Sequence, residues 1–206
     1  MLNNFFVIAG GWTVSQFNTR ELYRRGHVIG VNDAALWTNV HEALTMDRLW
    51  FENRWPYLRA AEVSSVWVRE KCDCNVPRKT KRDNWKTFRH YAKMVPSTTP
   101  NELHGGNSGT CAINLAFQRM SVGDRLFLLG FDMCSGPGNE PYWYPSYPWA
   151  APLGATKSGH FKKWANELEG FAQYATQQQF SVYNVSDRSK ISCWEKIRFG
   201  QMLELL

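Results

Sequence analysis

The segment 105–133, GGNSGTCAINLAFQRMSVGDRLFLLGFDM, constrains the fold more than any other part of the chain. After a polar loop with glycines, apolar side chains recur at the i, i+3, i+4, i+7 spacing of a helix with one buried face, at Ile113, Ala116, Phe117 and Met120. Residues 125–129 (RLFLL) then form an apolar run, typical of a strand covered on both faces. This order predicts half of a doubly wound α/β unit, in which ligands bind beyond the carboxyl ends of the strands.

The rest of the chain continues the alternation of strands and helices. Five further segments have the composition of strands: 5–9, 27–31, 42–46, 64–69 and 180–185. Helices are predicted near 16–25, from Asp47 to about Ala60, and from an N-cap at Ser158, with one apolar face formed by Phe161, Trp164, Leu168 and Phe171. We therefore expect an α/β, Rossmann-like, doubly wound and mostly parallel sheet in a single domain, residues 1–206.

A long loop rich in glycine, proline and aromatic residues separates the central strand from the last long helix. Residues 134–158 carry almost no charge, and their prolines exclude regular secondary structure. A loop of this kind that leaves a central strand is usually a lid or a specificity loop. The sequence predicts a long aromatic lid loop over about 134–158.

Composition limits the setting in which the chain works. No apolar run reaches the roughly 18 residues of a membrane span, and the N-terminus lacks the basic region of a signal peptide. Five cysteines without framework spacing fit a reduced compartment, so we expect a cytoplasmic protein. Ten tryptophans indicate a core or an oligomer interface, and a homo-oligomer is one expectation.

The positive charge of the chain is local. Residues 69–93 contain nine Lys or Arg and three acids, which accounts for the whole net charge of +6. Such a segment predicts contact with an anionic acceptor or another polyanion, although a solvated loop has the same composition.

Polar residues and glycines follow several predicted strands and open the predicted helix of the 105–133 segment. We expect the following candidates to surround one nucleotide site: Gly10, Gly11, Asn32, Asp33, Asp47, Asn107, Ser108, Gly109 and Asp132. Glycines allow close approach of a phosphate to the backbone, and Asn or Asp can bind a ribose or a base. Each is also a common turn former, so the combination carries the prediction.

His160 is the strongest candidate for acid–base chemistry. It lies in the first turn of the predicted last long helix, next to a tyrosine-rich loop. A histidine in that place suits proton abstraction during attack on a substrate with an anionic leaving group. His104, beside Gly105 and Gly106, is a weaker candidate.

Several of these segments, taken in order, resemble a known family. V-I-A-G-G near the start, an Asn after the second strand, N-S-G before an Ala-containing helix, L-F-L-L-G-F-D-M and a Gly-His opening the last long helix resemble bacterial sialyltransferases of the Campylobacter type and their hydroxymethylpterin diphosphokinase-like relatives. The resemblance implies a Rossmann-like fold that binds a CMP-linked sugar over the strand ends, in a divergent, compact member of the kind found in phage. It implies nucleotide binding by Gly10, Asn32, Ser108 and Gly109, support of the departing phosphate by Tyr142 or Tyr144, and His160 as general base.

Three functions follow from these observations. The first is a metal-independent glycosyltransferase that uses a nucleotide-sugar, needs no cofactor and has His160 as base. The second is a phosphoryl transferase in which Asp33, Asp47 and Asp132 hold Mg²⁺. The third is a non-catalytic nucleotide-binding protein, in which Trp12 and an altered glycine loop mark a lost active site.

Overall fold

The computed structural model describes residues 3–60, 63–70, 85–139, 142 and 158–206. In this part of the chain nine strands form one sheet, and every neighbouring pair is parallel. The strands are β1 (Asn4–Ile8), β2 (His27–Val31), β3 (Glu42–Thr45), β4 (Ser65–Arg69), β5 (Trp85–Tyr91), β6 (Glu102–His104), β7 (Arg125–Leu129), β8 (Ser181–Val185) and β9 (Glu195–Lys196). The expected α/β, Rossmann-like fold is confirmed.

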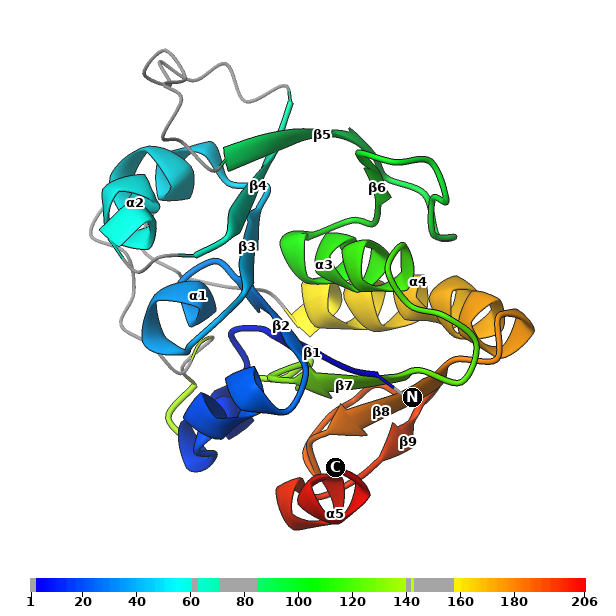
Figure 1. Cartoon of the computed structure of the whole chain (residues 1–206). Coiled ribbons are helices and arrows are strands. Elements are labelled where there is room, and N and C mark those ends of the chain that lie inside the picture. The colour runs from blue at the N-terminus through cyan, green and yellow to red at the C-terminus, as the bar shows by residue number, and fades with distance from the viewer. Residues whose placement is uncertain (1–2, 61–62, 71–84, 140–141, 143–157) are drawn as a thin grey trace.

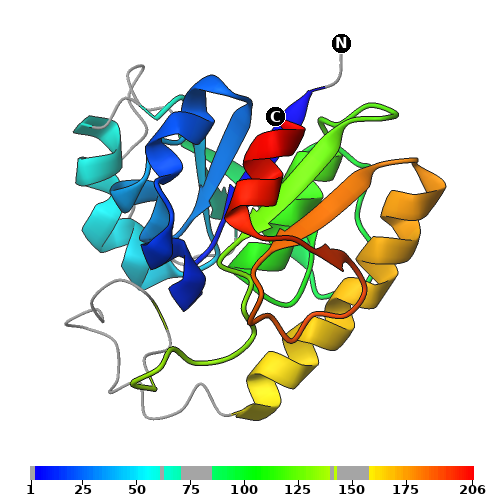
Figure 2. The same ribbon diagram turned by 90° about the horizontal axis from the view of Figure 1, so that it is seen from below.

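Helices cover both faces of the sheet (Figure 1). One face carries α3 (Ser108–Phe117) and α4 (Ser158–Gln177). The other carries two 3₁₀ helices, η1 (Trp12–Gln16) and η2 (Thr19–Arg24), with α1 (Ala34–Trp37), α2 (Arg48–Ala60) and α5 (Phe199–Leu205). Figure 2 looks at this second face, where α5 lies in front of the sheet.

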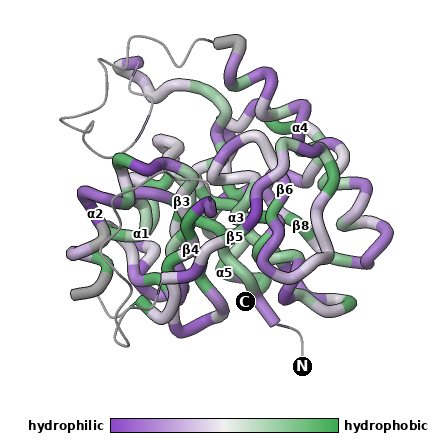
Figure 3. Tube along the Cα trace, turned by 90° about the horizontal axis from the view of Figure 1, so that it is seen from above, coloured by the Kyte–Doolittle hydropathy of each residue, from purple (hydrophilic) through white to green (hydrophobic). Residues whose placement is uncertain are grey.

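The two faces have separate apolar cores because side chains alternate along a strand. In β1, Phe5 and Val7 join the core under α3 and α4, whereas Phe6 and Ile8 join the core on the opposite face. A strand buried on both faces needs apolar residues at consecutive positions, which explains the run FFVI. In Figure 3 the hydrophobic residues are accordingly concentrated along the central strands.

The order of strands creates one switch in direction. The order is β6-β5-β4-β3-β2-β1-β7-β8-β9, so the chain moves outward from β1 to β6 and then returns through α3 to β7, on the other side of β1. Phe5 pairs with His27 on one side and with Leu126 on the other. Beyond the carboxyl ends of β1 and β7 the connections diverge, and this is where doubly wound sheets bind ligands.

All six predicted strands are present, and three further strands were not predicted. In β5 only Phe88 is buried, and β9 is two exposed residues long, so neither has the apolar run of an inner strand. β6 is only three residues long and lies at the edge of the sheet. Edge strands need few apolar side chains, because little of their surface is covered.

Two other expectations differ from the structure or lie outside it. The helix predicted near 16–25 is interrupted, because the backbone is extended at Phe17, whose ring stacks on Phe199 of α5 at 4.5 Å between centroids. Most of the predicted aromatic lid loop, residues 140–141 and 143–157, lies outside the described residues.

Candidate functional site

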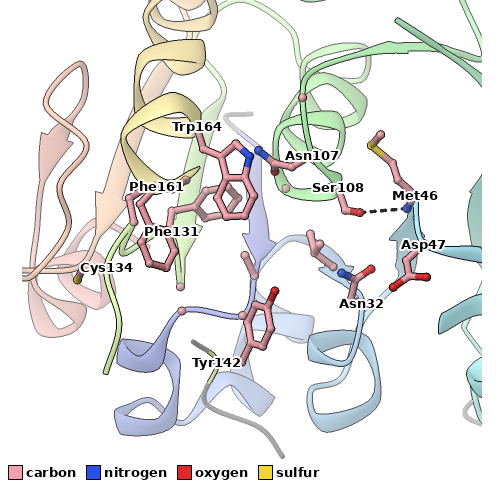
Figure 4. A pocket seen from close by; sticks show the side chains of 18 residues that line it. Asn32, Met46, Asp47, Asn107, Ser108, Phe131, Cys134, Tyr142, Phe161 and Trp164 are labelled. Carbon is pink, nitrogen blue, oxygen red and sulfur yellow. Dashed lines mark hydrogen bonds between the residues drawn. The ribbon is translucent and has the colours of Figure 1, made fainter. Parts of the chain in front are cut away.

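A pocket of about 340 Å³ lies beyond the carboxyl ends of β1, β2, β3 and β7, at the switch in strand order (Figure 4). Its volume is within the range of small-molecule sites, about 300–1,000 Å³. Its lining combines strand ends, the start of α3 and the first turns of α4: Ala9, Gly10, Gly11, Val31, Asn32, Met46, Asp47, Gly106, Asn107, Ser108, Gly109, Gly130, Phe131, Met133, Cys134, Tyr142, Phe161 and Trp164. The pocket therefore brings together most of the predicted nucleotide-binding residues.

The glycines after β1 form the floor of this pocket by packing against β7. The N–H of Gly11 donates to the carbonyl of Gly130 at 2.8 Å. A Cβ on Gly11 would lie 2.4 Å from that same oxygen, and Gly130 has φ +73°, a conformation that favours glycine. The N–H of Gly11 is therefore used within the fold, and Gly11 is needed for the close approach of the two strand ends.

Asn32 forms one polar wall. Its backbone has φ +51°, which asparagine tolerates better than most residues, and its N–H donates to the carbonyl of Leu44. Its side-chain Oδ1 is buried and has no hydrogen-bond partner among the described residues. Asp47 lies beside it, with Oδ1 accepting from the backbone N–H of Trp50 in the first turn of α2. Buried oxygens are normally paired, so the unpaired Oδ1 of Asn32 stands out within the described part of the fold.

The amino terminus of α3 forms the opposite polar wall. Asn107 is the N-cap, and its Oδ1 accepts from the N–H of Thr110 at 3.0 Å. Ser108 Oγ accepts from the N–H of Met46, which ties the helix to the end of β3. Nδ2 of Asn107 is buried without a partner in the described part of the chain. With the N–H groups of Ser108 and Gly109, which precede the first intrahelical bonds, it makes this wall a donor surface that suits an anion.

Aromatic side chains close the remaining side. Figure 4 shows Phe131, Phe161 and Trp164 grouped together, with Tyr142 reaching toward the pocket from below. Phe131 follows β7 and touches the start of α3, where a Cβ on Gly109 would lie 3.1 Å from its ring. These rings offer flat apolar surface to a base or a sugar.

Two predicted site residues are directed elsewhere. Asp132 is buried, and its carboxylate accepts from both the N–H and the hydroxyl of Thr13, so it anchors η1 to the end of β7. Asp33 is also buried, where it accepts from Nε1 of Trp50 at 2.6 Å and pairs with Arg54. Burial raises the pKa of Asp33, while the Trp50 and Arg54 contacts oppose that shift. Neither residue lines the pocket.

His160 lies beside the pocket. It is the exposed third residue of α4, and its ring centroid is 6.0 Å from that of Trp164, which lines the pocket. His104 is instead a structural residue, whose ring bonds the carbonyl of Val95 and the carboxylate of Glu102. Tyr144 lies outside the described residues.

The three aspartates suggested for Mg²⁺ do not share a site. Asp47 lines the pocket, whereas Asp33 is held by Trp50 of α2 and Asp132 by Thr13 of η1. Over the residues the structure describes, no group of three or more His, Cys, Asp or Glu is placed to hold a metal ion.

Several lining residues were missed at the level of sequence. Met46, Met133 and Cys134 follow strand ends, as the predicted polar residues do, but only polar residues were selected there. Phe161 and Trp164 were assigned to the buried face of α4, and they line the pocket because the first turns of α4 lie beyond the sheet. The sequence did contain a sign that they line a pocket, because this apolar face begins directly after the long loop that leaves the central strand.

Comparisons with protein-family models, curated proteins and solved structures give no match to this chain. Of the helices in the described residues, none is both long enough and apolar enough to cross a membrane.

Proposed function

We propose that this protein is a metal-independent glycosyltransferase that binds a nucleotide-sugar in the pocket beyond β1, β2, β3 and β7. The observation that carries the proposal is a pair of buried, unpartnered polar atoms, Asn32 Oδ1 and Asn107 Nδ2, on two residues that line one cavity at the switch in strand order. Buried polar groups are normally paired, so an acceptor and a donor left open across one pocket support a polar ligand with both kinds of group.

The two walls suit different parts of a nucleotide. The start of α3 offers the N–H groups of Ser108 and Gly109 and Nδ2 of Asn107 to the phosphate. Asn32 and Asp47 accept from hydroxyl or amine groups of the ribose and base. Phe161 and Trp164 cover the sugar, and the ring centroid of Trp164 is 6.0 Å from that of His160.

The transfer step needs a base and a stabilised leaving group. His160 takes the proton of the acceptor hydroxyl as its oxygen bonds the anomeric carbon from the face opposite the phosphate. The bond between that carbon and the phosphate oxygen breaks, and its electron pair leaves with the nucleotide, which is CMP for the donor that the family resemblance implies. Tyr142 and the start of α3 stabilise the charge on the departing phosphate. Tyr144, the other candidate for this role, is a proposal from sequence alone.

A non-catalytic nucleotide-binding protein is the second candidate. It is favoured by two observations, since the N–H of Gly11 is used by Gly130 and His160 is not among the residues that line the pocket. Trp12, predicted to mark a lost active site, does not line the pocket either, and its ring centroid lies 5.3 Å from the guanidinium of Arg188.

A ligand screen followed by a turnover assay tests the proposal. Thermal shift with nucleotides and nucleotide-sugars, with and without Mg²⁺, should give the largest stabilisation with CMP and a CMP-linked sugar, independent of Mg²⁺. Release of CMP from the sugar then separates an enzyme from a binding protein. Binding without release supports the second candidate, binding that requires Mg²⁺ supports phosphoryl transfer, and no stabilisation by any nucleotide would refute all three.

A further inference from the structure

A second cavity, of about 570 Å³, lies directly beside the nucleotide pocket on the side of α4 and β8. Three residues, Met133, Cys134 and Phe161, line both cavities and therefore form the wall between them. The rest of its lining consists of Ser135, Gly136, Asn139, Lys162, Ala165, Asn166 and Lys190. Ligands bound in the two cavities would therefore be separated by these three residues.

The second cavity is positively charged. Lys162 comes from the second turn of α4, and Lys190 follows β8, with its backbone N–H donating to the carbonyl of Asp132. Among the described residues that line the cavity none is acidic. The nearby carboxylate of Asp132 is already engaged by Thr13. Lys162, Lys190 and Asn166 thus line a space whose described lining holds no carboxylate.

The pKa of the Cys134 thiol depends on the charges near this cavity. Burial raises its pKa, and the charge of Asp132 raises it further, whereas the cations of Arg188 and Lys190 act in the opposite direction. Sγ of Cys134 contacts the carbonyl of Arg188 at 3.7 Å, and Cys134 lines both cavities.

We infer that the second cavity is the acceptor subsite and takes a small hydroxyl-bearing molecule with a phosphate or carboxylate group. Its anionic group binds Lys162 and Lys190, and its hydroxyl points across Cys134 and Phe161 toward the sugar in the nucleotide pocket. His160 directly precedes Phe161 in α4, and its ring centroid is 6.0 Å from that of Trp164. This inference rests on the proposed function and deepens it. It also moves the acceptor away from the basic segment 69–93, of which residues 71–84 lie outside the described residues.

Alkylation of Cys134 measures the charge of the cavity without knowledge of the acceptor. Iodoacetate is anionic and iodoacetamide is neutral, and both react with the thiolate. Peptide mass spectrometry gives the alkylation rate of each reagent at Cys134. The ratio of the iodoacetate rate to the iodoacetamide rate measures how strongly the cavity attracts an anion. In Lys162→Gln/Lys190→Gln this ratio should fall about threefold or more at low salt, and the difference should vanish near 1 M salt. Lys163→Gln/Lys196→Gln, which removes the same charge outside the cavity, should keep the native ratio.

A small probe then tests binding. Glycerol 3-phosphate should slow alkylation of Cys134 by iodoacetamide in the native protein, glycerol should not, and Lys162→Gln/Lys190→Gln should lose the protection. Glycerol malonate monoester in place of the phosphate tells carboxylate from phosphate recognition. Any of three results would overturn the inference. The rate ratio is unchanged in Lys162→Gln/Lys190→Gln, glycerol 3-phosphate still protects that variant, or neither reagent alkylates Cys134. Stabilisation by CMP is measured separately, so the two proposals can fail independently. If the alkylation tests are negative but CMP stabilises the protein, only the acceptor subsite is refuted. If CMP does not stabilise the protein but the alkylation tests are positive, the cavity is an anion site and the proposed donor is refuted.

Discussion

Two groups of polar side chains, one around Glu42 at the amino ends of the strands and one around the pocket at the carboxyl ends, differ in their hydrogen bonding. At the amino ends of β2 and β3, Glu42 accepts from Arg119 and, at 2.6 Å, from Nε1 of Trp67, while Nε2 of His27 also contacts Arg119. At the carboxyl ends, Asn32 Oδ1 and Asn107 Nδ2 are buried without partners among the described residues. A paired polar cluster stabilises the fold, whereas an unpaired one leaves hydrogen bonds for a ligand. We call the first group the structural end and the second, where the proposed ligand would lie, the binding end.

His160→Ala should have the largest effect and act on the binding end alone. Because a general base contributes about 10²–10⁴-fold in rate, release of CMP from a CMP-linked sugar should fall by that factor. The unfolding free energy and CMP affinity should remain near their native values, because the side chain is exposed. Full activity in the variant would remove His160 from the mechanism, and a large loss of stability would make it a structural residue.

Glu42→Ala should have the next largest effect, at the structural end. Removing one partner of a buried ion pair costs about 3 kcal/mol or more, because Arg119 and the indole N–H of Trp67 lose their acceptor. Urea unfolding followed by tryptophan fluorescence measures this loss, and Glu195→Ala, at an exposed position of β9, is the matched control. If the two variants lose equal stability, the amino end has no special structural role.

The structural end should also make the fold sensitive to acid. Burial, with Arg119 and His41, lowers the pKa of His27 to about 4 against the attraction of Glu42, and burial also lowers the pKa of His41. Between pH 6.5 and 4 the unfolded chain therefore binds a proton at His27 that the folded chain does not. The unfolding free energy should fall as pH falls through this window, by at most about 1.4 kcal/mol per pH unit from His27.

His27→Gln isolates that contribution. Denaturation at a series of pH values should show a flatter dependence in the variant, with a remaining part from His41. An identical slope in both proteins would mean that His27 does not carry the effect.

Asn32→Gly should have the smallest effect, on binding rather than on stability. Glycine adopts φ +51° readily and removes an unpaired buried oxygen, so the unfolding free energy should change by less than about 1 kcal/mol. CMP affinity, measured by calorimetry, should fall about tenfold, the value of one hydrogen bond to a ligand. Asn39→Gly, at an exposed position, should leave affinity unchanged. If the variant is destabilised and keeps native CMP affinity, Asn32 stabilises the fold and does not bind the ligand.

The sequence alone determined the layers of this protein. Apolar runs such as FFVI and RLFLL specify strands buried on both faces, and the spacing of Ile113, Ala116 and Phe117 specifies the covering helix, because both signals are local and periodic. The carboxyl ends of β1, β2, β3 and β7 follow from those strands, so the position of a pocket could be predicted. The outer strands β5, β6 and β9 could not, since β5 and β9 carry few apolar residues and β6 is only three residues long.

Only the tertiary structure decided which strand-end residues face the pocket. Asn32 and Asp33 are neighbours in sequence, yet Asn32 keeps an open oxygen while Trp50, 17 residues further on, takes the carboxylate of Asp33. Asp132 is likewise taken by Thr13, 119 residues away. A turn-forming residue and a ligand-binding residue have the same local sequence signal. They differ in whether a donor from a distant part of the chain hydrogen-bonds to the side chain in the folded protein.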